Sequence, residues 1–324
     1  MRTELLHFYK NKKVLVTGGA GFIGSHLVEA LVALDARVTV LDNFSTGSQE
    51  NLASVQDQIS IIDGTITDYK TCLQATHNSS LIFHLAALAS VPESCQNPRA
   101  CHDTNVTGTH NLLEAARQNN IQRFIFSSSA AVYGPHEGLC SETTPCNPCS
   151  PYGLSKFVGE LYCHQYTQLY ELETTVLRYF NVYGDRQKAN TGVVAHFRHS
   201  LATGVPLTIH GDGMQERDFV PVQTIVTANL LLGSTPRSTI NDHVRATFNI
   251  ATGTSISLIS LVNRLKSQYP DYNHPICFVP ARPGDIRFSA ADCTKFHQIL
   301  ADRTSDHTSI FYGILDQNTQ ETSL

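Results

Sequence analysis

A cluster of glycines directly after a short apolar run constrains the fold of this chain more than any other feature. Residues 14–16 are Val, Leu and Val, a run typical of a strand buried on both faces of a parallel sheet. Gly18, Gly21 and Gly24 follow, and apolar residues then recur at helical spacing from Phe22 onward. Glycine permits a turn with positive φ and a close approach of the backbone to a pyrophosphate. The pattern predicts a strand, a glycine turn and a helix whose N-terminus faces the phosphates of a dinucleotide.

The choice of dinucleotide depends on Asp42. A second apolar run at residues 37–41 ends at this aspartate, eighteen residues after Gly24. A carboxylate at that place accepts hydrogen bonds from the ribose 2′-hydroxyl of adenosine and repels a 2′-phosphate, so we expect NAD rather than NADP. The alternative is an ordinary βαβ turn with an aspartate at the end of a strand.

Strands alternate with helices along the first half of the chain. Further strands are predicted at residues 59–62, 81–84, 123–126 and 174–177, and helices at 103–119 and 152–170. This alternation is typical of an α/β fold in which a doubly wound parallel sheet, of the Rossmann kind, is covered by helices on both faces. Ligands of such sheets bind at the carboxyl ends of the strands.

The pattern loosens after Tyr179. We expect an NAD-binding domain over residues 1–180, with residues 220–246 returning to it through a helix at 224–232. A smaller, substrate-binding lobe is expected mainly over 181–303, its bulk coming from 181–194, 197–218 and 247–289. Polar residues dominate from 304 to 324, and we expect a mobile tail there.

Composition excludes some classes of partner. The formal net charge is −5, which leaves no basic footprint for nucleic acid. No apolar run approaches the ~20 residues of a membrane-spanning helix, and residues 1–13 lack the apolar core of a signal peptide. We therefore expect a cytoplasmic protein with neither nucleic acid nor membrane as a partner.

The nine cysteines do not indicate a disulfide framework, because they are scattered and odd in number. Cys140, Cys146 and Cys149 form the one cluster, and a metal site there would need a fourth ligand such as His136. The interpretation we favour is reduced thiols in a proline-containing loop, so no metal is expected.

Candidate catalytic residues come from the end of one strand and the start of the next helix. Three serines, residues 127–129, follow the strand predicted at 123–126, and Tyr152 and Lys156 lie four positions apart on one helix face. A nearby ammonium favours phenolate and should lower the pKa of Tyr152, which makes this tyrosine a candidate acid and base. Ser129 could bridge Tyr152 and an oxygen of the substrate. The alternative is a surface pair of tyrosine and lysine.

Nine segments spread over almost the whole chain carry a more specific pattern. They are residues 17–24, 42–47 (DNFSTG), 84–87 (HLAA), 105–109 (NVTGT), 127–134 (SSSAAVYG), 150–156 (SPYGLSK), 178–184 (RYFNVYG), 217–219 (RDF) and 282–285 (RPGD). Together they resemble the extended short-chain dehydrogenases/reductases, and within them the UDP-sugar 4-epimerases. The three serines at this strand end resemble those of epimerases. Related dehydratases carry Thr-Asp-Glu at the same place, and related decarboxylases carry a glutamate.

The resemblance implies a mechanism with NAD as a permanently bound cofactor. Tyr152 would take the proton of the sugar 4-hydroxyl while C4 passes hydride to NAD. The 4-keto sugar would turn over, and hydride would return to its other face. Ser129 would hydrogen-bond the 4-oxygen, and Lys156 would hold the nicotinamide ribose and lower the pKa of Tyr152.

The resemblance also implies two sets of binding residues. Those expected to contact NAD are Gly18, Gly21, Phe22, Ile23, Gly24, Asp42, Asn43, Ser45, Thr46, Gly47, Thr65, Ile66, Leu85, Ala86, Ala87, Asn105, Tyr152, Lys156, Tyr179 and Phe180. Those expected to contact the UDP-sugar are Ala89, Ser90, Ser129, Tyr152, Asn181, Gly192, Val193, Arg217, Arg282, Asp285 and Ser289. In the family, the positions of Asn181, Arg217 and Arg282 contact the diphosphate, as suits arginine forks.

Some positions depart from the family pattern. Thr65 stands where an aspartate usually touches the adenine amino group, so we expect a weaker adenine contact but retained NAD binding. Gln223 and Thr224 stand where aspartate is common. The usual Leu-Gly-Trp motif is missing near residues 299–301.

The sugar is suggested by two small residues. Residues 85–94 resemble bacterial epimerases that prefer N-acetylated UDP-hexosamines, which have a small residue where Ala89 stands. Ser289 falls where the family has a gatekeeper beside the C2 substituent, and a serine leaves room for an acetamido group. The resemblance thus implies UDP-GlcNAc and UDP-GalNAc, unless Ser289 is a loop serine without a sugar contact.

Other functions remain open at this point. UDP-glucose and UDP-glucuronate 4-epimerases are the nearest alternatives, and a net oxidoreductase or dehydratase is a third. A non-catalytic NAD-binding regulatory protein would be expected to have a broken set of Ser129, Tyr152 and Lys156. Panels of UDP-sugars would separate these functions.

The resemblance implies a homodimer as well. The helices at 103–119 and 152–170 match those that form a four-helix interface in the family. Leu154, Phe157, Leu161 and Tyr162 give the second helix an apolar stripe beyond the Tyr152 and Lys156 face.

Overall fold

A seven-stranded parallel sheet forms the centre of the protein. The computed structural model describes residues 1–189, 191–240, 246–281 and 286–303. The strands lie in the order β3-β2-β1-β4-β5-β6-β11, and every pair is parallel. Their bounds are β1 Lys13–Thr17, β2 Arg37–Asp42, β3 Ser60–Asp63, β4 Leu81–His84, β5 Arg123–Ser129, β6 Glu173–Tyr179 and β11 Thr247–Ile250. The order reverses beside β1, so the predicted doubly wound fold is confirmed.

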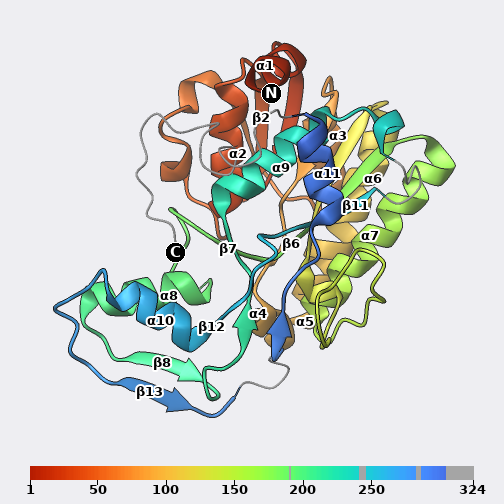
Figure 1. Ribbon diagram of the computed structural model, residues 1–324. Helices are drawn as coiled ribbons and strands as arrows, with labels where there is room; N and C mark the ends of the chain where they lie inside the picture. The colour runs from red at the N-terminus through yellow and green to blue at the C-terminus, as the bar shows by residue number, and fades with distance from the viewer. Residues whose placement is uncertain (190, 241–245, 282–285, 304–324) are drawn as a thin grey trace.

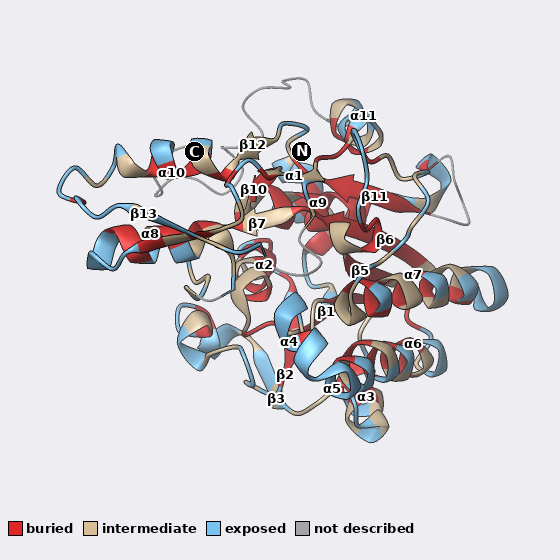
Figure 2. Cartoon of the chain, turned by 90° about the horizontal axis from the view of Figure 1, so that it is seen from below, coloured by how far each residue is buried: buried red, intermediate tan, exposed pale blue. Residues whose placement is uncertain are grey.

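Helices cover both faces of this sheet because its strands bury side chains in both directions. Val14 and Val16 of β1 belong to one hydrophobic cluster and Leu15 to another, as the two-residue period of a strand requires. The first cluster contains α2 (Phe22–Val32) and α9 (Val222–Ser234), and also α1 (Arg2–Tyr9) and α11 (Thr294–Asp302). The second contains α3 (Tyr69–Thr76), α6 (Gly108–Gln118) and α7 (Pro151–Tyr170). Figure 2 shows the buried residues on the strands and on the helix sides facing them.

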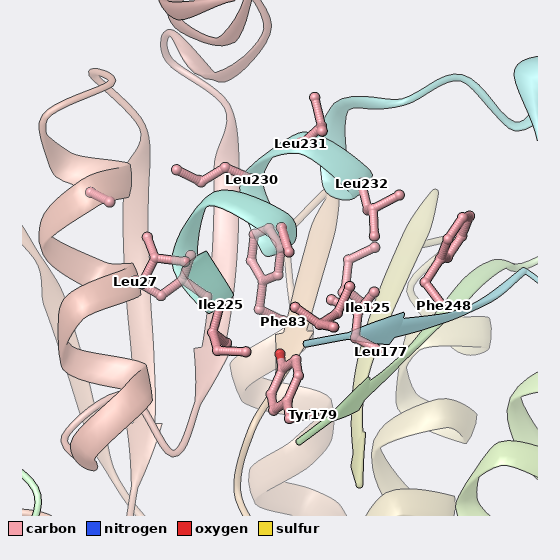
Figure 3. Close-up of a cluster of buried hydrophobic side chains, with 14 of the residues drawn as sticks. Leu27, Phe83, Ile125, Leu177, Tyr179, Ile225, Leu230, Leu231, Leu232 and Phe248 are labelled. Carbon is pink, nitrogen blue, oxygen red and sulfur yellow. The ribbon is translucent and has the colours of Figure 1, made fainter. Parts of the chain in front are cut away.

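Figure 3 shows the first cluster at closer range. Leu27 of α2 and Ile225 of α9 lie on one side of the strand residues Phe83, Ile125 and Leu177. All five side chains are buried, at 1% exposure or less. The helix at 222–234 therefore packs on the large sheet, which is the return to the first domain that its apolar sequence predicts.

A second, smaller lobe has its own hydrophobic cluster. It contains α8 (Val193–Thr203) and α10 (Leu258–Lys266), which lie against the parallel pair β8 (Leu207–His210) and β13 (Ile276–Val279). Figure 1 shows these four elements together at one end of the molecule. Phe197 and Leu261 are central to this cluster, with 1% and 0% of their surface exposed.

Short strands connect the two lobes. β7 (Asn181–Tyr183) pairs with β10 (Phe219–Pro221), and β9 (Glu216–Arg217) pairs with both β12 (Ile256–Ser257) and β14 (Phe288–Ser289). Remaining short helices are α4 (Val91–Gln96) and α5 (Pro98–His102). These connecting strands carry three of the residues expected to bind the substrate.

The structure differs from the sequence prediction in the place of residues 247–250. We expected them in the smaller lobe, but β11 pairs with β6 in the large sheet. The reason is a satisfied polar side chain: Asn249 is fully buried, donates to the carbonyls of Cys140 and Asp292, and accepts from the Tyr133 hydroxyl. Polar residues that alternate along β11 therefore do not indicate that one face of this strand contacts solvent.

Two boundaries also differ. The strand predicted at 123–126 extends through the three serines, because Ser129 still pairs with Tyr179 of β6. The helix predicted at 103–119 begins earlier, with α5, and passes through a π-helical turn at Asp103–Thr107 before α6. The tail at 304–324 lies outside the described residues.

Candidate active site

The glycine turn between β1 and α2 is built as the sequence predicts. Gly18 has φ +70°, in the left-handed region, and its N–H donates to the Leu41 carbonyl at 2.9 Å. A side chain on Gly24 would collide with the Gly18 carbonyl oxygen, so helix and turn approach more closely than any other residue allows. Gly21 occupies the N-cap of α2. The backbone is thus arranged as a cradle at a helix N-terminus.

Asp42 is fixed at the end of β2, beside this turn. Its carboxylate accepts the N–H groups of Ala20 and Phe44, each at 2.9 Å, and it is 8% exposed. These bonds use two of about four acceptor positions on a carboxylate, which leaves capacity for a ribose hydroxyl. The loop after Asp42 folds back locally, since Asn43 accepts both the N–H and the hydroxyl of Ser45. The turn and this carboxylate together fit NAD.

Thr65 follows β3 and is engaged locally. Its hydroxyl oxygen contacts the Thr67 hydroxyl at 2.9 Å and accepts the Thr67 N–H at 3.2 Å. Ile66 is buried, and a side chain on Gly108 would overlap it. Thr46 and Gly47 complete the loop after β2, where Gly47 packs closely on Ala20.

A buried chain of hydrogen bonds lies behind the end of β4. His84 Nδ1 lies 2.7 Å from the Thr17 hydroxyl, and its Nε2 lies 2.9 Å from that of Thr109. Thr109 donates to the Asn105 carbonyl, so it accepts from Nε2–H, and Nδ1 accepts from Thr17. Burial lowers the pKa of His84 to about 3, which keeps the ring neutral. These hydrogen bonds hold β1, β4 and the helical segment after α5 in fixed positions around residues 85–87.

Asn105 connects that segment to the proposed catalytic helix. Its amide accepts the N–H of Leu88 at 2.8 Å, donates to the Leu88 carbonyl at 3.0 Å, and donates to the Ser155 hydroxyl at 2.9 Å. Ser155 in turn donates to the Tyr152 carbonyl. Asn105 is 2% exposed, so it positions the loop after β4, including Leu85, Ala86 and Ala87, against the start of α7.

The three proposed catalytic residues are brought together. The Ser129 hydroxyl lies close enough to the Tyr152 phenol to lower the pKa of that phenol. Lys156 is 4% exposed and donates to the Ser127 carbonyl at 2.8 Å. Ser150 caps α7 by accepting the Gly153 N–H, and Pro151 begins the helix. The cap therefore fixes the place of Tyr152 in the first turn.

The protonation of this group differs from the sequence expectation. We expected Lys156 to lower the pKa of Tyr152, but burial raises it, against a smaller lowering from the Ser129 hydrogen bond. The physical reason is desolvation of the phenolate, while the Lys156 ammonium is bonded to a backbone carbonyl. Burial also lowers the pKa of Lys156, to about 8. Burial therefore works against the phenolate, which is the form of Tyr152 that could accept a proton.

The predicted substrate residues of the connecting strands lie side by side. Ser289 and Arg217 are register partners in β14 and β9. Asp218 joins them to Asn181, because its N–H donates to the Ser289 carbonyl and its own carbonyl accepts the Asn181 N–H and side-chain amide. Arg217 donates to the Glu216 carbonyl at 2.8 Å. Arg217 and Ser289 thus lie in one small sheet, and Asn181 lies in the neighbouring pair of β7 and β10.

Other predicted residues have a structural place of their own. Gly192 is the N-cap of α8 and Val193 its first residue. Ser90 caps α4, accepting the Glu93 N–H, and Ala89 precedes it on an exposed loop. Arg282 and Asp285 lie outside the described residues.

Tyr179 and Phe180 are placed in the core. The Tyr179 side chain points toward α9 (Figure 3) and bonds Asn229 and Ser127, and Phe180 is 4% exposed. Any cofactor contact at these two positions therefore falls to the backbone. Nothing in the spacing of the sequence marks Asn229 as the partner, fifty positions from Tyr179.

Neither a group of metal ligands nor a membrane-spanning helix is found among the described residues. Over the residues that the structure describes, no group of three or more His, Cys, Asp or Glu side chains could hold a metal ion. Cys146 instead accepts a hydrogen bond from Arg178. Within the same ranges, none of the helices combines the length and apolar character needed to cross a bilayer.

Comparisons with known proteins agree with this geometry. The model of the NAD dependent epimerase/dehydratase family matches residues 14–251. A UDP-glucose 4-epimerase of Mycolicibacterium smegmatis is 38% identical over 295 residues, which is 89% of this chain and 92% of that protein.

Two solved structures are similar over most of their length. The UDP-glucose 4-epimerase of Thermotoga maritima, solved with UDP-glucose, has a TM-score of 0.82 at 37% identity and covers 88% of this chain and 91% of its own. The UDP-N-acetylglucosamine 4-epimerase of Methanobrevibacter ruminantium, in complex with UDP-N-acetylmuramic acid, has a TM-score of 0.84 at 36% identity, with coverages of 94% and 96%.

Proposed function

This chain belongs to the NAD dependent epimerase/dehydratase family, and on that premise we propose that it is a UDP-sugar 4-epimerase that interconverts UDP-GlcNAc and UDP-GalNAc. The observation that carries the reaction type is the cluster of Ser129, Tyr152 and Lys156 at the end of β5, beside the glycine turn. The relatives named above are 4-epimerases of UDP-sugars.

The roles of the catalytic residues follow from their contacts. NAD, when bound, supplies a reversible acceptor of hydride. Tyr152 takes the proton from the sugar 4-oxygen in one direction and returns it in the other. Ser129 lies beside the phenol, where its hydroxyl would hydrogen-bond the sugar 4-oxygen. Lys156 is buried at the same strand end, donates to the Ser127 carbonyl, and would hold the nicotinamide ribose.

We assign the binding residues from the family resemblance. The glycine turn and Asp42 hold the pyrophosphate and the adenosine ribose of NAD. Asn181 and Arg217 of the connecting strands, with Arg282 and Asp285, hold the UDP group. Gly192 and Val193 present the N-terminus of α8 to it.

The choice of sugar rests on Ser289. Its side chain is half-buried next to Arg217 in the small sheet between the lobes. Its small volume leaves room for a C2 acetamido group, and Ala89, on the loop after β4, is small as well. UDP-glucose is the second candidate, because relatives named for that activity share 38% identity with this chain.

The direct test is incubation of the purified protein with UDP-GlcNAc and no added NAD. We expect UDP-GalNAc to accumulate to equilibrium without net reduction of the nucleotide. Absence of product from UDP-GlcNAc and from UDP-glucose alike would contradict the epimerase assignment. Release of water, or accumulation of NADH, would indicate a dehydratase or a net oxidoreductase.

We also propose a homodimer. Leu154, Leu161, Leu169 and Tyr170 of α7 are between 48% and 58% exposed, an apolar face that a second copy of the α6 and α7 pair would cover. Phe157 instead packs on the core, and Tyr162 packs against His110.

Light scattering should give a dimer mass, and Leu161→Glu should shift it to monomer. Val205→Glu, a change at an equally exposed valine of the smaller lobe, is the matched control. A wild-type monomer at micromolar concentration would contradict the dimer.

A further inference from the structure

Each of the three serines at the end of β5 is joined to helix α7. The Ser129 hydroxyl lies beside the Tyr152 phenol, and the Ser127 carbonyl accepts from Lys156. The Ser128 hydroxyl donates to the Glu160 carboxylate. Tyr152, Lys156 and Glu160 are spaced four apart, so they form one stripe on the buried face of the helix. The catalytic pair and this glutamate therefore meet the same strand.

Glu160 is also paired with an arginine of the next strand. Arg178 of β6 donates to both carboxylate oxygens, at 2.6 and 2.9 Å. The two side chains are 6% and 1% exposed. Ser128 and Arg178 are direct register partners across β5 and β6. The carboxylate is thus held by two neighbouring strands at once, in a bidentate geometry that restricts its orientation.

The surroundings hold Arg178 in turn. Its guanidinium lies 4.8 Å from the centre of the Tyr133 ring and donates to the Glu142 carbonyl and to Cys146. All of these partners come from the segment between β5 and α7. The ion pair is therefore enclosed by the same loop that leads into the catalytic helix.

A buried ion pair is weak evidence for stability, because the cost of desolvation offsets most of its attraction. It does fix geometry, and in this place the geometry is that of the catalytic residues. We propose that Ser128, Glu160 and Arg178 are positioning residues for catalysis: they set α7 against β5 so that the Tyr152 phenol stays within hydrogen-bond reach of Ser129. This inference rests on the proposed epimerase function and names residues that act through Tyr152.

The first test removes one contact and keeps the ion pair. Ser128→Ala should lower kcat at least about tenfold, since small misplacements of reacting groups cost up to about a hundredfold. KM for the UDP-sugar and the content of bound NAD should change less than twofold. Thr174→Val is the matched control: Thr174 is 1% exposed and donates from β6 to the Cys163 carbonyl of the same helix, far from Tyr152. The control should lose thermal stability without losing kcat.

Two further variants separate positioning from general destabilisation. Ser128→Thr keeps the hydroxyl and should restore most of kcat. Glu160→Asp keeps the charge but shortens the side chain, and it should lower kcat with KM unchanged, which tests the same point should Ser128→Ala fold poorly. Equal falls in kcat for Ser128→Ala and Thr174→Val, or unchanged kcat in both Ser128→Ala and Glu160→Asp, would overturn the proposal.

A double variant distinguishes this inference from the function on which it rests. In a Tyr152→Phe background, Ser128→Ala should cause no further loss, because its effect passes through the phenol. A full additional loss there would overturn positioning through Tyr152. If Tyr152→Phe alone kept normal kcat, the proposed mechanism itself would fail.

Discussion

Tyr152 carries the central chemical role, and its environment makes that role testable. The Ser129 hydroxyl lies beside its phenol, and burial raises the pKa of this phenol. Tyr152→Phe removes the proton carrier with little change in volume. We expect turnover to fall by ~10²–10⁴-fold, the usual contribution of a general acid and base, while NAD stays bound. Absorbance of the purified variant for bound nucleotide and a single-turnover assay check both parts.

The titration of Lys156 should make the free energy of unfolding depend on pH. Burial lowers its pKa from 10.5 to about 8, so the folded state binds fewer protons than the unfolded state between these values. Stability therefore rises with pH across this window, relative to a chain without the lysine. We expect the free energy of unfolding of wild type, compared with that of Lys156→Met, to increase from about pH 8 to pH 10.5. Denaturant unfolding at several pH values measures this difference, and a flat or falling difference would show that Lys156 titrates normally.

Whereas stability should rise with pH in this window, kcat should fall. In the proposed mechanism the ammonium form of Lys156 holds the nicotinamide ribose, so kcat should decline as pH rises above about 8 and this ammonium loses its proton. This pH window follows from burial as the dominant cause of the shift.

At the scale of elements, the β1–α2 unit has no room for a side chain at Gly24. A Cβ on Gly24 would meet the Gly18 carbonyl oxygen and the Gly19 backbone. Gly24→Ala should therefore separate the helix from the turn and reduce both NAD content and melting temperature. Gly204→Ala is a useful comparison, because Gly204 has φ +71° but open space around it. An unchanged NAD content in Gly24→Ala would contradict the close packing of this turn.

Elements with a repeating pattern could be predicted from the sequence, and elements defined by distant polar partners could not. The β1–α2 unit follows from glycine spacing and helical periodicity, which are local. The place of β11 could not be predicted, because its Asn249 depends on Cys140 and Tyr133, more than a hundred positions away. Ser129, Tyr152 and Lys156 were predicted from motif and helix spacing, whereas the ion pair of Glu160 and Arg178 becomes visible only when β6 is placed beside β5.

At the scale of the whole molecule, two contacts join the substrate-binding elements to the NAD-binding sheet. The buried Asp218 carboxylate accepts the N–H groups of Thr252 and Gly253, which follow β11. Arg186, after β7, donates to Ser25 and Glu29 of α2. Asp218 therefore anchors the strands around Ser289 to the large sheet, and Arg186 anchors the segment after β7 to α2.

The central claim is the combination of 4-epimerisation with a preference for N-acetylated sugars, and kcat/KM tests it most directly. The measurement uses UDP-GlcNAc, UDP-GalNAc, UDP-glucose and UDP-galactose with wild type and Ser289→Tyr. Wild type should favour the N-acetylated pair. The tyrosine should lower kcat/KM for that pair about tenfold to a hundredfold, as overpacking of ~1–3 kcal/mol predicts, while sparing UDP-glucose and UDP-galactose. Equal losses on both pairs, or a wild-type preference for UDP-glucose, would contradict the account.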